Sequence, residues 1–508
     1  MFKKKLTDKI LSTLAFGLTA MMPLAVLGTV SAAERPQTIV MTDGEVDDMD
    51  SFLRFLLYTN EVDVKGIVYT SSCWHYSGDG KGTKFQTHID FVKNYHPGYH
   101  TDLRWCGTDW IHDYIETYRK VYPNLVQHDA NYPTADKLQS LVKIGNIAFE
   151  GESEQDTEGS DFIKKQLLSE ENAPIYFETW GGTNTLARAL KSIENTCKGT
   201  EQWKAIYKKV SQKVVLYRIM EQDDSYETYI RSHWPDIKVY YNTWQFASLA
   251  YIWPQAVPKE QQTYLRGDWM KKNILQGEYG SRYMTYGDGH KLAGDPEDVF
   301  GDLAVAHKNG YGQYDLISEG DSPSFLYLID NGLRSLENPS YGGWSGRLSP
   351  SAATKNLWED NIASYDYNPH TAKRDKYYSQ TRWIGDFQND FAARIAWTQT
   401  NDYKKANHAP TDITVKEGLD IPVKPGQKIT LHVTAKDPDG NSLSYKWYNY
   451  EEAGTYHAPV KVTGKGAQAS LTVPENAGSG ETIHVICEIT DDGTPPLTRY
   501  ARVILTAE

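Results

Sequence analysis

The sequence predicts an α/β fold with a mostly parallel sheet and helices on both faces, followed by an all-β sandwich. The first observation is that β-branched runs between residues 38 and 397 end in polar or glycine-rich loops, each followed by an apolar run with helical spacing. The second is a change after residue 408 to short alternating runs, which turn signals such as Asp437-Pro438-Asp439-Gly440 separate. The first pattern is typical of parallel strands joined by helices, the second of antiparallel sheets.

The first strand–loop–helix unit spans Thr38 to Leu57 and carries an acidic loop. A strand is expected at Thr38-Ile39-Val40, and an apolar run with helical spacing extends from Met49 to Leu57. Six residues between them contain four carboxylates, from Asp43, Glu45, Asp47 and Asp48. Carboxylates this close repel one another unless a hard cation neutralises them. The alternative is a solvated acidic turn in which an aspartate caps the helix.

Further units follow in order. A strand over residues 62–72 ends in a polar and aromatic loop, helices are expected at 114–122 and 135–147, and residues 150–160 form an exposed acidic loop. Residues 174–187 again read as strand, glycine loop and helix, and the glycines allow the backbone to approach a ligand closely. Thr183 or Asn184 would cap the helix that follows.

The later units repeat the pattern. Strands are expected at 213–219 and 237–241, with the acidic loop Glu221-Gln222-Asp223-Asp224 between them. A loop over residues 276–312, an acidic loop with a helix at 316–326 and a helix over 383–397 follow. Since the carboxyl ends of parallel strands meet at one edge of a sheet, the acidic and glycine-rich loops should gather there.

The two ends of the chain differ from this pattern. Residues 1–33 read as a secretory signal peptide, because four lysines precede an apolar run that ends in Val-Ser-Ala-Ala. The run is short and contains Pro23, so we expect a secreted or periplasmic protein without a membrane anchor. Residues 34–407 would form the α/β domain, and residues 408–508 an immunoglobulin-like sandwich with Trp447 in its core.

Composition narrows the class of ligand. The formal net charge is −13, and loss of the four lysines and one aspartate of residues 1–33 takes it to −16, which argues against nucleic-acid binding. The chain has 35 Tyr and 14 Trp at a mean hydropathy of −0.58, a composition that suits sugar binding. The four cysteines form no CxxC motif, so a zinc or redox site is not indicated. Cys73 and Cys106 could pair or could both stay free.

Three motifs resemble those of nucleoside hydrolases. Asp43-x-x-x-Asp47-Asp48 looks like the family's amino-terminal signature, although Met41 and Gly44-Glu45 depart from it. The stretch Thr179-Trp-Gly-Gly-Thr-Asn184 is similar to the family's threonine–glycine–leucine–threonine–asparagine loop. Residues 319–323, Glu-Gly-Asp-Ser-Pro, lie where the family's last metal aspartate is expected.

A closer resemblance covers nearly the whole chain after residue 33. Residues 42–48, 222–224, 319–326, 331–333 and 342–344 resemble a bacterial nucleoside-hydrolase-like, cellulose-binding family, in which such a domain precedes a carboxy-terminal β-sandwich. The resemblance implies a Ca²⁺ site with oxygens from Asp43, Asp48, Asp321 and the Thr179 carbonyl. Asp47 would bind a sugar hydroxyl, and Asp43 would also act as general base toward the attacking water. Further predicted substrate-binding residues are Trp74, His75, Trp180, Asn184, Gln222, Asp223 and Glu319.

The resulting hypothesis is an exported, Ca²⁺-dependent hydrolase that cleaves a glycosidic bond with inversion. The bond would be N-ribosidic, or O-glycosidic in a plant or algal polysaccharide. Gly320 occupies the position of the family's acid histidine. The candidates for a general acid are therefore His75, Glu178, Asp223, His290 and Glu319. The alternative is a carbohydrate (cellulose)-binding protein without activity. The four aspartates favour the first hypothesis, and Gly320 favours the second.

Overall fold

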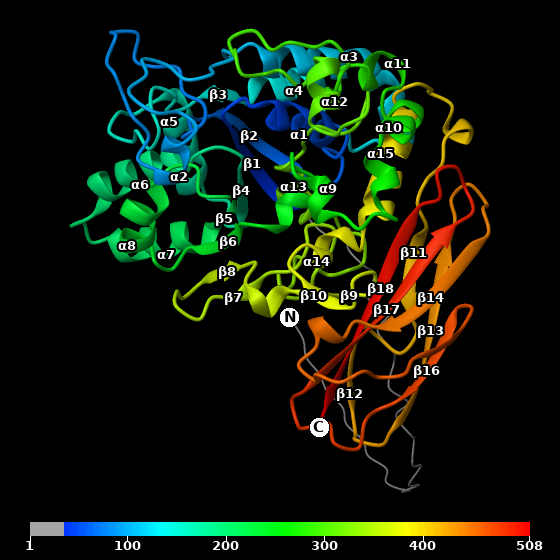
Figure 1. Cartoon of the computed structure of the whole chain (residues 1–508). Helices are drawn as coiled ribbons and strands as arrows, with labels where there is room; N and C mark the ends of the chain where they lie inside the picture. Colours follow the sequence, from blue (N-terminus) through cyan, green and yellow to red (C-terminus); the bar gives the residue numbers. More distant parts are fainter. Residues whose placement is uncertain (1–34) are drawn as a thin grey trace, which may run out of the picture. The chain divides into compact units, whose positions relative to one another are not determined.

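The computed structural model describes residues 35–508, and the predicted signal peptide lies outside the described residues. An eight-stranded sheet in the order β3-β2-β1-β4-β5-β6-β8-β7 forms the centre of the first domain (Figure 1). Its strands are β1 (Gln37–Thr42), β2 (Asp63–Tyr69), β3 (Val142–Ile144), β4 (Ile175–Thr179), β5 (Val214–Ile219), β6 (Lys238–Asn242), β7 (Ser349–Pro350) and β8 (Leu357–Glu359). Every neighbouring pair is parallel except β7 and β8, which confirms the mostly parallel sheet.

Helices cover both faces of this sheet (Figure 1). One face packs against α1 (Val46–Leu56), α3 (Trp110–His128), α13 (Ser322–Leu326) and α15 (Ile384–Trp397), and the other against α5 (Glu158–Leu168), α6 (Asn184–Cys197) and α7 (Trp203–Lys213). Val40 of β1 belongs to the first core, while Ile39 and Met41 belong to the second. Side chains alternate across a strand, so a strand covered on both faces must be apolar throughout.

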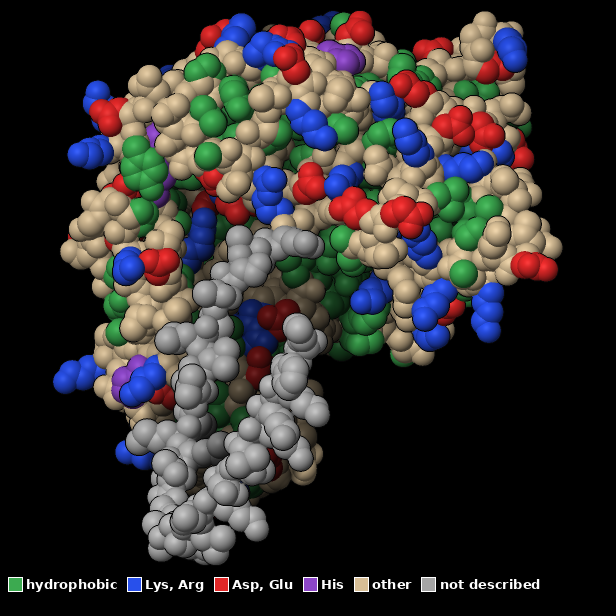
Figure 2. All heavy atoms as spheres, turned by 180° about the vertical axis from the view of Figure 1, so that it is seen from behind, with side chains coloured by type: hydrophobic (Ala, Val, Ile, Leu, Met, Phe, Trp, Pro, Cys, Tyr) green, Lys and Arg blue, Asp and Glu red, His purple; other side chains and the backbone are tan. Residues whose placement is uncertain are grey.

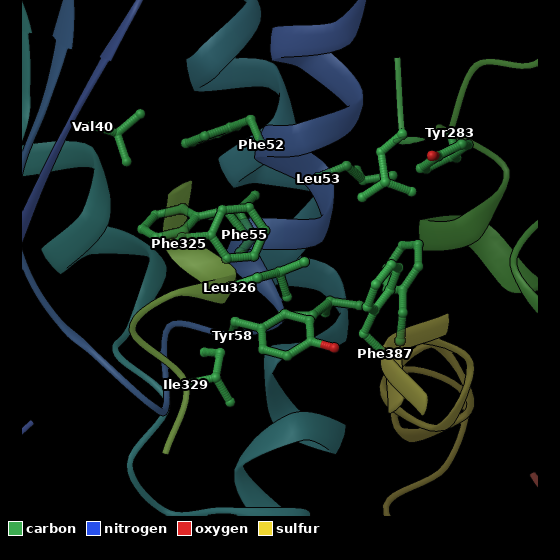
Figure 3. Packing of buried hydrophobic residues seen from close by; sticks show 14 of the residues in the cluster. Val40, Phe52, Leu53, Phe55, Tyr58, Tyr283, Phe325, Leu326, Ile329 and Phe387 are labelled. Carbon is green, nitrogen blue, oxygen red and sulfur yellow. The ribbon is translucent and has the colours of Figure 1, made fainter. Parts of the chain in front are cut away.

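The core between α1 and α13 positions the candidate site. Phe55 of α1 packs edge-on against Phe325 of α13, with ring centroids 5.4 Å apart. Figure 3 shows Phe52, Phe55, Phe325 and Leu326 filling this contact. Because Asp47 and Asp48 lie in the first turn of α1 and Asp321 directly precedes α13, this packing fixes the three carboxylates relative to one another.

The observed elements differ from the predicted ones at two places. The helix expected over 135–147 ends at Ser140 as α4 (Ala135–Ser140), and β3 follows because Val142 pairs with Ile67 of β2. The region 276–312, expected as loop, contains α11 (Gly277–Gly280) and α12 (Leu303–Lys308), and the Asp302 side chain caps α12. The remaining elements are α2 (Asp90–Lys93), α8 (Arg231–His233), α9 (Trp253–Ala256), α10 (Gly267–Asn273), α14 (Tyr378–Thr381), β9 (Asp366–Asn368), β10 (Lys373–Asp375), η1 (Tyr226–Ile230), η2 (Gln245–Ser248), η3 (Gln262–Leu265), η4 (Ile362–Ser364), η5 (Tyr403–Lys405) and η6 (Glu451–Ala453).

Two four-stranded sheets form the C-terminal sandwich. One contains β11 (Thr411–Val415), β13 (Lys428–Lys436), β16 (Gln468–Thr472) and β15 (Thr463–Lys465), and the other β12 (Asp420–Val423), β18 (Thr498–Ala507), β17 (Thr482–Asp491) and β14 (Leu443–Asn449). Trp447 is a core residue as predicted: its side chain is buried and its Nε1–H donates to the Gly466 carbonyl at 3.0 Å. The predicted boundary at residue 408 lies between η5 and β11.

The sandwich packs directly on the α/β domain. The Tyr500 hydroxyl of β18 donates to Asp386 of α15 at 2.5 Å, and Arg499 pairs with Asp390 at 2.9 Å. A Cβ on Gly332 would lie 1.9 Å from the Tyr500 carbonyl oxygen, so only glycine fits there. Residues 36–508 therefore form one compact unit with a continuous core.

The surface shows charges of both signs. On the face seen in Figure 2, Lys and Arg side chains are interspersed with Asp and Glu rather than gathered in one patch. No helix within residues 35–508 is long and apolar enough to span a bilayer. Cys73 and Cys106 are free thiols, so the disulfide considered for them is not formed.

His484 of β17 should make the fold sensitive to acid. Burial and the neighbouring Arg502 lower the pKa of His484 to about 3, and Arg502 donates to its Nδ1 at 3.0 Å. Below the ordinary histidine pKa of about 6.5 the unfolded chain binds a proton that the folded chain excludes. The free energy of unfolding therefore decreases as the pH is lowered. We expect His484→Gln to lose less stability than wild type between about pH 7.5 and about pH 5, by on the order of 1–2 kcal/mol in urea unfolding. The exposed His457→Gln is the control, and parallel pH curves for all three proteins would contradict the prediction.

Candidate functional site

An acidic cluster lies at the carboxyl edge of the sheet. One carboxylate oxygen from each of Asp47, Asp48 and Asp321 lies within 4.8 Å of the other two. Asp43 is adjacent, because its backbone N–H donates to Asp48 Oδ1 at 3.2 Å. The structure thus brings together the four aspartates that the sequence placed at two distant loops.

Local contacts hold these aspartates in place. The Thr42 hydroxyl donates to Asp48 Oδ1, and the Ser318 hydroxyl lies 3.3 Å from Asp47 Oδ2. The first turn of α1 also favours negative charge, because its free backbone N–H groups and the helix dipole attract anions. A Cβ on Gly181 would lie 2.9 Å from Asp43 Cβ, so the glycine lets the β4 loop close over Asp43.

Several buried carboxylate oxygens of the cluster have no hydrogen-bond donor in the described chain. They are both oxygens of Asp43 and Oδ2 of Asp321, in residues that are each 2% exposed. Burial raises the pKa of Asp47, Asp48 and Asp321, and the neighbouring carboxylates raise it further. Buried oxygens without partners and an all-oxygen donor set fit a hard divalent cation such as Ca²⁺.

The grouping differs from the predicted ligand set. Asp47, expected to bind a sugar hydroxyl, lies with Asp48 and Asp321, whereas Asp43 lies beside His75 with 3.7 Å between Oδ2 and Nδ1. Thr179 ends β4, and its hydroxyl donates to the Tyr217 carbonyl at 2.8 Å. A metal-binding role for the Thr179 carbonyl stays a prediction.

His75 is part of a buried charge network that the sequence motifs do not predict. Its Nε2 lies 3.9 Å from Asp295 Oδ2, and Arg104 binds Asp295 through Nε at 3.0 Å and Nη2 at 2.8 Å. Burial alone would lower the pKa of His75, but Asp295, Asp43 and Glu45 raise it to about 9. Burial would raise the pKa of Asp295, but His75 and Arg104 hold it well below its usual value. The only sequence signal was the Gly/Asp-rich character of residues 276–312.

Two residues at this site adopt left-handed backbone conformations. Arg104 has φ +43° and Met220, directly after β5, has φ +58°. Such conformations cost energy for residues with a side chain and concentrate at functional sites. Here the backbone conformation of Arg104 presents the guanidinium group that binds Asp295.

Three predicted substrate-binding residues stabilise the glycine loop: Asn184 and Asp223 are buried, and Gln222 is partly exposed. Asp223 accepts from the Thr183 hydroxyl at 3.0 Å and from the Asn184 N–H at 2.9 Å, so it caps α6. The Asn184 amide donates to Ser71 Oγ and to two backbone carbonyls, and the Gln222 amide donates to the Trp180 carbonyl. Their contact with a sugar stays a prediction.

Trp180 and Glu319 are buried core residues, and the sugar contact predicted for them stays a prediction. Trp180 is 1% exposed, and its Nε1–H donates to Ser324 Oγ at 2.9 Å. Glu319 pairs with Arg54 at 3.0 Å, and both side chains are fully buried. Each residue joins α1 or β4 to the α13 segment, because helix packing covers this end of the sheet.

Glu178 and His290 are the remaining acid candidates, and their contacts are with residues other than Asp43. Burial raises the pKa of Glu178 to about 8, and this side chain has no exposed surface. His290 pairs with Asp288 at 2.5 Å and Asp298 at 3.4 Å beside a cavity of about 710 Å³. A Cβ on Gly320 would lie 2.9 Å from Asp47 Oδ2, so a histidine at that position has no room without rearrangement.

Comparison with known proteins agrees with this architecture. The family model described as "Cellulose-binding Sde182, nucleoside hydrolase-like domain" matches residues 37–348. The chain belongs to this family. A second model, "Cellulose-binding protein Sde0182, C-terminal domain", matches residues 428–507, in the order that the sequence predicted. Comparison with curated proteins gives no match.

Solved structures show the fold. A nucleoside hydrolase-related hypothetical protein from Saccharophagus degradans, associated with carbohydrate metabolism, is 23% identical with a TM-score of 0.68, over 93% of this chain and 100% of that chain. An inosine-guanosine nucleoside hydrolase (9% identity, 72% and 98% covered, TM-score 0.31) and the type III effector XopQ complexed with adenosine diphosphate ribose (10%, 72% and 95%, 0.35) align too weakly to carry an inference.

The buried ion pair predicts a structural role for Glu319. Glu319→Ala leaves Arg54 buried without its carboxylate, and we expect the free energy of unfolding to fall by about 3–5 kcal/mol in urea titrations. The double variant Arg54→Met/Glu319→Met should recover much of this loss, since it removes both charges. Glu260→Ala, at an exposed side chain, is the control. Unchanged stability in Glu319→Ala would contradict the structural role.

Proposed function

We propose that the chain is an exported, Ca²⁺-dependent hydrolase of glycosidic bonds. The observation that carries this proposal is the group formed by Asp47, Asp48 and Asp321, whose carboxylate oxygens lie within 4.8 Å of one another and of which the last two are buried, beside an Asp43 carboxylate that lacks donors. The family descriptions, both of which name cellulose binding, support a carbohydrate as the ligand. Export is proposed from residues 1–33.

Asp48 and Asp321 would hold the ion, together with Asp47 or Asp43. When bound, Ca²⁺ would neutralise the crowded carboxylates, bind sugar hydroxyls and make a water more acidic. Burial and the neighbouring carboxylates raise the pKa of Asp47, Asp48 and Asp321, so a bound cation would compensate the repulsion between their charged forms.

Asp43 would be the general base. Its two oxygens accept no hydrogen bond from the described chain, so one can take the proton of a water that attacks the anomeric carbon. The neighbouring His75 would position this carboxylate and balance its charge, while the Asp295–Arg104 pair holds the imidazole. Asp47 would bind a ring hydroxyl as the sugar takes on oxocarbenium character.

His75 is poorly placed to protonate the leaving group. In an inverting reaction the acid and base act from opposite faces of the sugar, with their carboxyl groups about 6.5–9.5 Å apart. His75 lies 3.7 Å from the base Asp43, and the other acid candidates are engaged with protein partners or fully buried. We therefore expect the leaving group to depart largely without a proton from the protein.

Calcium binding is the first test. Calorimetric titration of chelator-treated protein should give a Ca²⁺ site, and saturating Ca²⁺ should raise the melting temperature. Asp48→Asn and Asp321→Asn should weaken binding about tenfold or more, because each removes a negative ligand. Asp330→Asn, an exposed aspartate shortly after α13, is the control. Absence of a Ca²⁺-dependent shift, or an equal loss in the control, would overturn the calcium assignment.

The leaving group provides the second test. Activated p-nitrophenyl glycosides should be cleaved faster than the corresponding methyl glycosides by about 10²-fold or more, the usual contribution of a general acid. His75→Gln should lower kcat by a similar factor on both substrates, because it acts through Asp43. If His75→Gln spares the p-nitrophenyl substrates, His75 is the acid and the assigned role is wrong.

A non-catalytic carbohydrate-binding protein is the second candidate, and the glycine at position 320, where the family has its acid histidine, favours it. Retention by soluble or insoluble cellulose without turnover of any activated nucleoside or glycoside would support this candidate over the hydrolase.

A further inference from the structure

Glu45 lies between Asp43 and Asp47 at the start of α1, and no role has been assigned to it so far. It does not belong to the group formed by Asp47, Asp48 and Asp321, and its position departs from the nucleoside-hydrolase signature. Its side chain is 17% exposed, whereas Asp43, Asp48 and Asp321 are at most 2% exposed. Glu45 and the partly exposed Asp47 are therefore the carboxylates of this loop that solvent reaches.

The protein holds one oxygen of the Glu45 carboxylate. The Tyr251 hydroxyl donates to Oε1 at 2.9 Å, and Arg104 Nη2 lies 3.7 Å from the same oxygen. The Tyr251 ring is fixed in turn, because it stacks on Phe300 with ring centroids 5.3 Å apart. Arg104 is fixed by the two hydrogen bonds that its Nε and Nη2 donate to Asp295. The Glu45 carboxylate is therefore oriented before a ligand binds.

The other oxygen of this carboxylate is available as an acceptor. Glu45 Oε2 lies 3.7 Å from His75 Nδ1, which is too far for a hydrogen bond, and it accepts none from residues 35–508. A carboxylate oxygen is an acceptor only, so its natural partner is a hydroxyl or N–H group of a ligand. Such hydrogen bonds are stronger than those between neutral groups.

Glu45 and Asp47 lie beside the same neighbouring segment. A Cβ on Gly320 would lie 2.9 Å from Asp47 Oδ2 and 3.5 Å from the Ala250 Cβ, and Ala250 directly precedes Tyr251, the partner of Glu45. The electrostatics agree with this placement: burial raises the pKa of Asp47, and the charge of Glu45 raises it more than any other charge does. One ligand can therefore contact both carboxylates.

We propose that Glu45 Oε2 accepts a hydrogen bond from a second hydroxyl of the sugar ring that Asp47 holds, and so determines which sugar the site binds. The inference rests on the proposed function in taking the acidic cluster as the sugar site. A sugar without a hydroxyl at this place would leave the oriented oxygen unpaired. Sites built to bind a ligand hydroxyl discriminate strongly against analogues that lack it.

Calorimetric titration of the Ca²⁺-saturated protein with methyl glycosides tests this assignment. The ligands are methyl β-D-glucopyranoside, β-D-galactopyranoside, β-D-xylopyranoside and β-D-ribofuranoside, and the tightest of them is compared with each of its monodeoxy forms. In wild type, loss of the hydroxyl bound by Glu45 should weaken binding about tenfold or more. In Glu45→Ala, the same deoxy sugar and its parent should bind equally, because the acceptor is gone. The hydroxyl bound by Asp47 should keep its effect in both proteins.

Glu359→Gln is the matched control, because Glu359 is also a partly exposed glutamate and lies on β8, four strands from β1 in the sheet. It should bind all sugars as wild type does. Tyr251→Phe, which removes the donor to Glu45 Oε1, should reduce the effect of the same hydroxyl less than Glu45→Ala does. The Ca²⁺ affinity of Glu45→Ala should fall far less than that of Asp48→Asn.

Three results would overturn the proposal. Equal weakening of the parent sugar and of every deoxy form in Glu45→Ala would give Glu45 a structural role alone. A loss of Ca²⁺ affinity in Glu45→Ala as large as that in Asp48→Asn would make it an ion ligand. Absence of binding of every methyl glycoside to wild type would leave Glu45 without a sugar to select.

The outcomes separate this inference from the hydrolase. Dependence on one hydroxyl that disappears in Glu45→Ala, in a protein that cleaves no activated glycoside, would overturn hydrolysis and leave the sugar contact standing. Cleavage of p-nitrophenyl glycosides by a protein whose preference among deoxy sugars is the same in wild type and Glu45→Ala would overturn the sugar contact alone.

Discussion

Burial of several like charges at one point is the constraint on which the first domain depends. Asp47, Asp48 and Asp321 lie within 4.8 Å of one another with little contact to solvent for two of them, an arrangement that opposes folding unless protons or a cation compensate. The contacts between α1 and α13 hold these three aspartates in this arrangement. The Phe55–Phe325 packing and the Arg54–Glu319 ion pair act a few residues away from the carboxylates. The same two helices would therefore couple stability to the binding of the proposed ion.

The chemistry of the site is asymmetric. Asp43, the proposed base, is surrounded by groups that orient it, namely His75, Asp48 and the Gly181 backbone. The side from which a leaving group would be protonated has no comparable group among the acids considered. A side chain at Gly320 would meet the Asp47 carboxylate, with 2.9 Å between its Cβ and Asp47 Oδ2. Binding energy from further sugar contacts would help such a site, because remote contacts can stabilise the reacting geometry.

The two domains differ in whether their aromatic side chains are buried or exposed, and composition alone does not indicate this difference. The sandwich buries Trp447 and uses Tyr500 and Arg499 to brace α15. The exposed Phe91 and Tyr95 rings, which contact Trp74, belong instead to the α/β domain. The sandwich thus braces α15 through the contacts of Tyr500 and Arg499.

The sequence by itself determined the parallel sheet, the sandwich and the acidic loop at residues 43–48, because strand and helix periodicity and short motifs are local properties. Asp321 was linked to this loop only through the resemblance to a known family. Only the tertiary structure decided that residues 142–144 pair with β2, that Asp47 joins Asp48 and Asp321, and that Trp180 and Glu319 are buried. It also placed Arg104 and Asp295, far apart in the chain, around His75. These facts depend on which distant segments pack together, and packing between residues far apart in the chain leaves no periodic trace in the sequence.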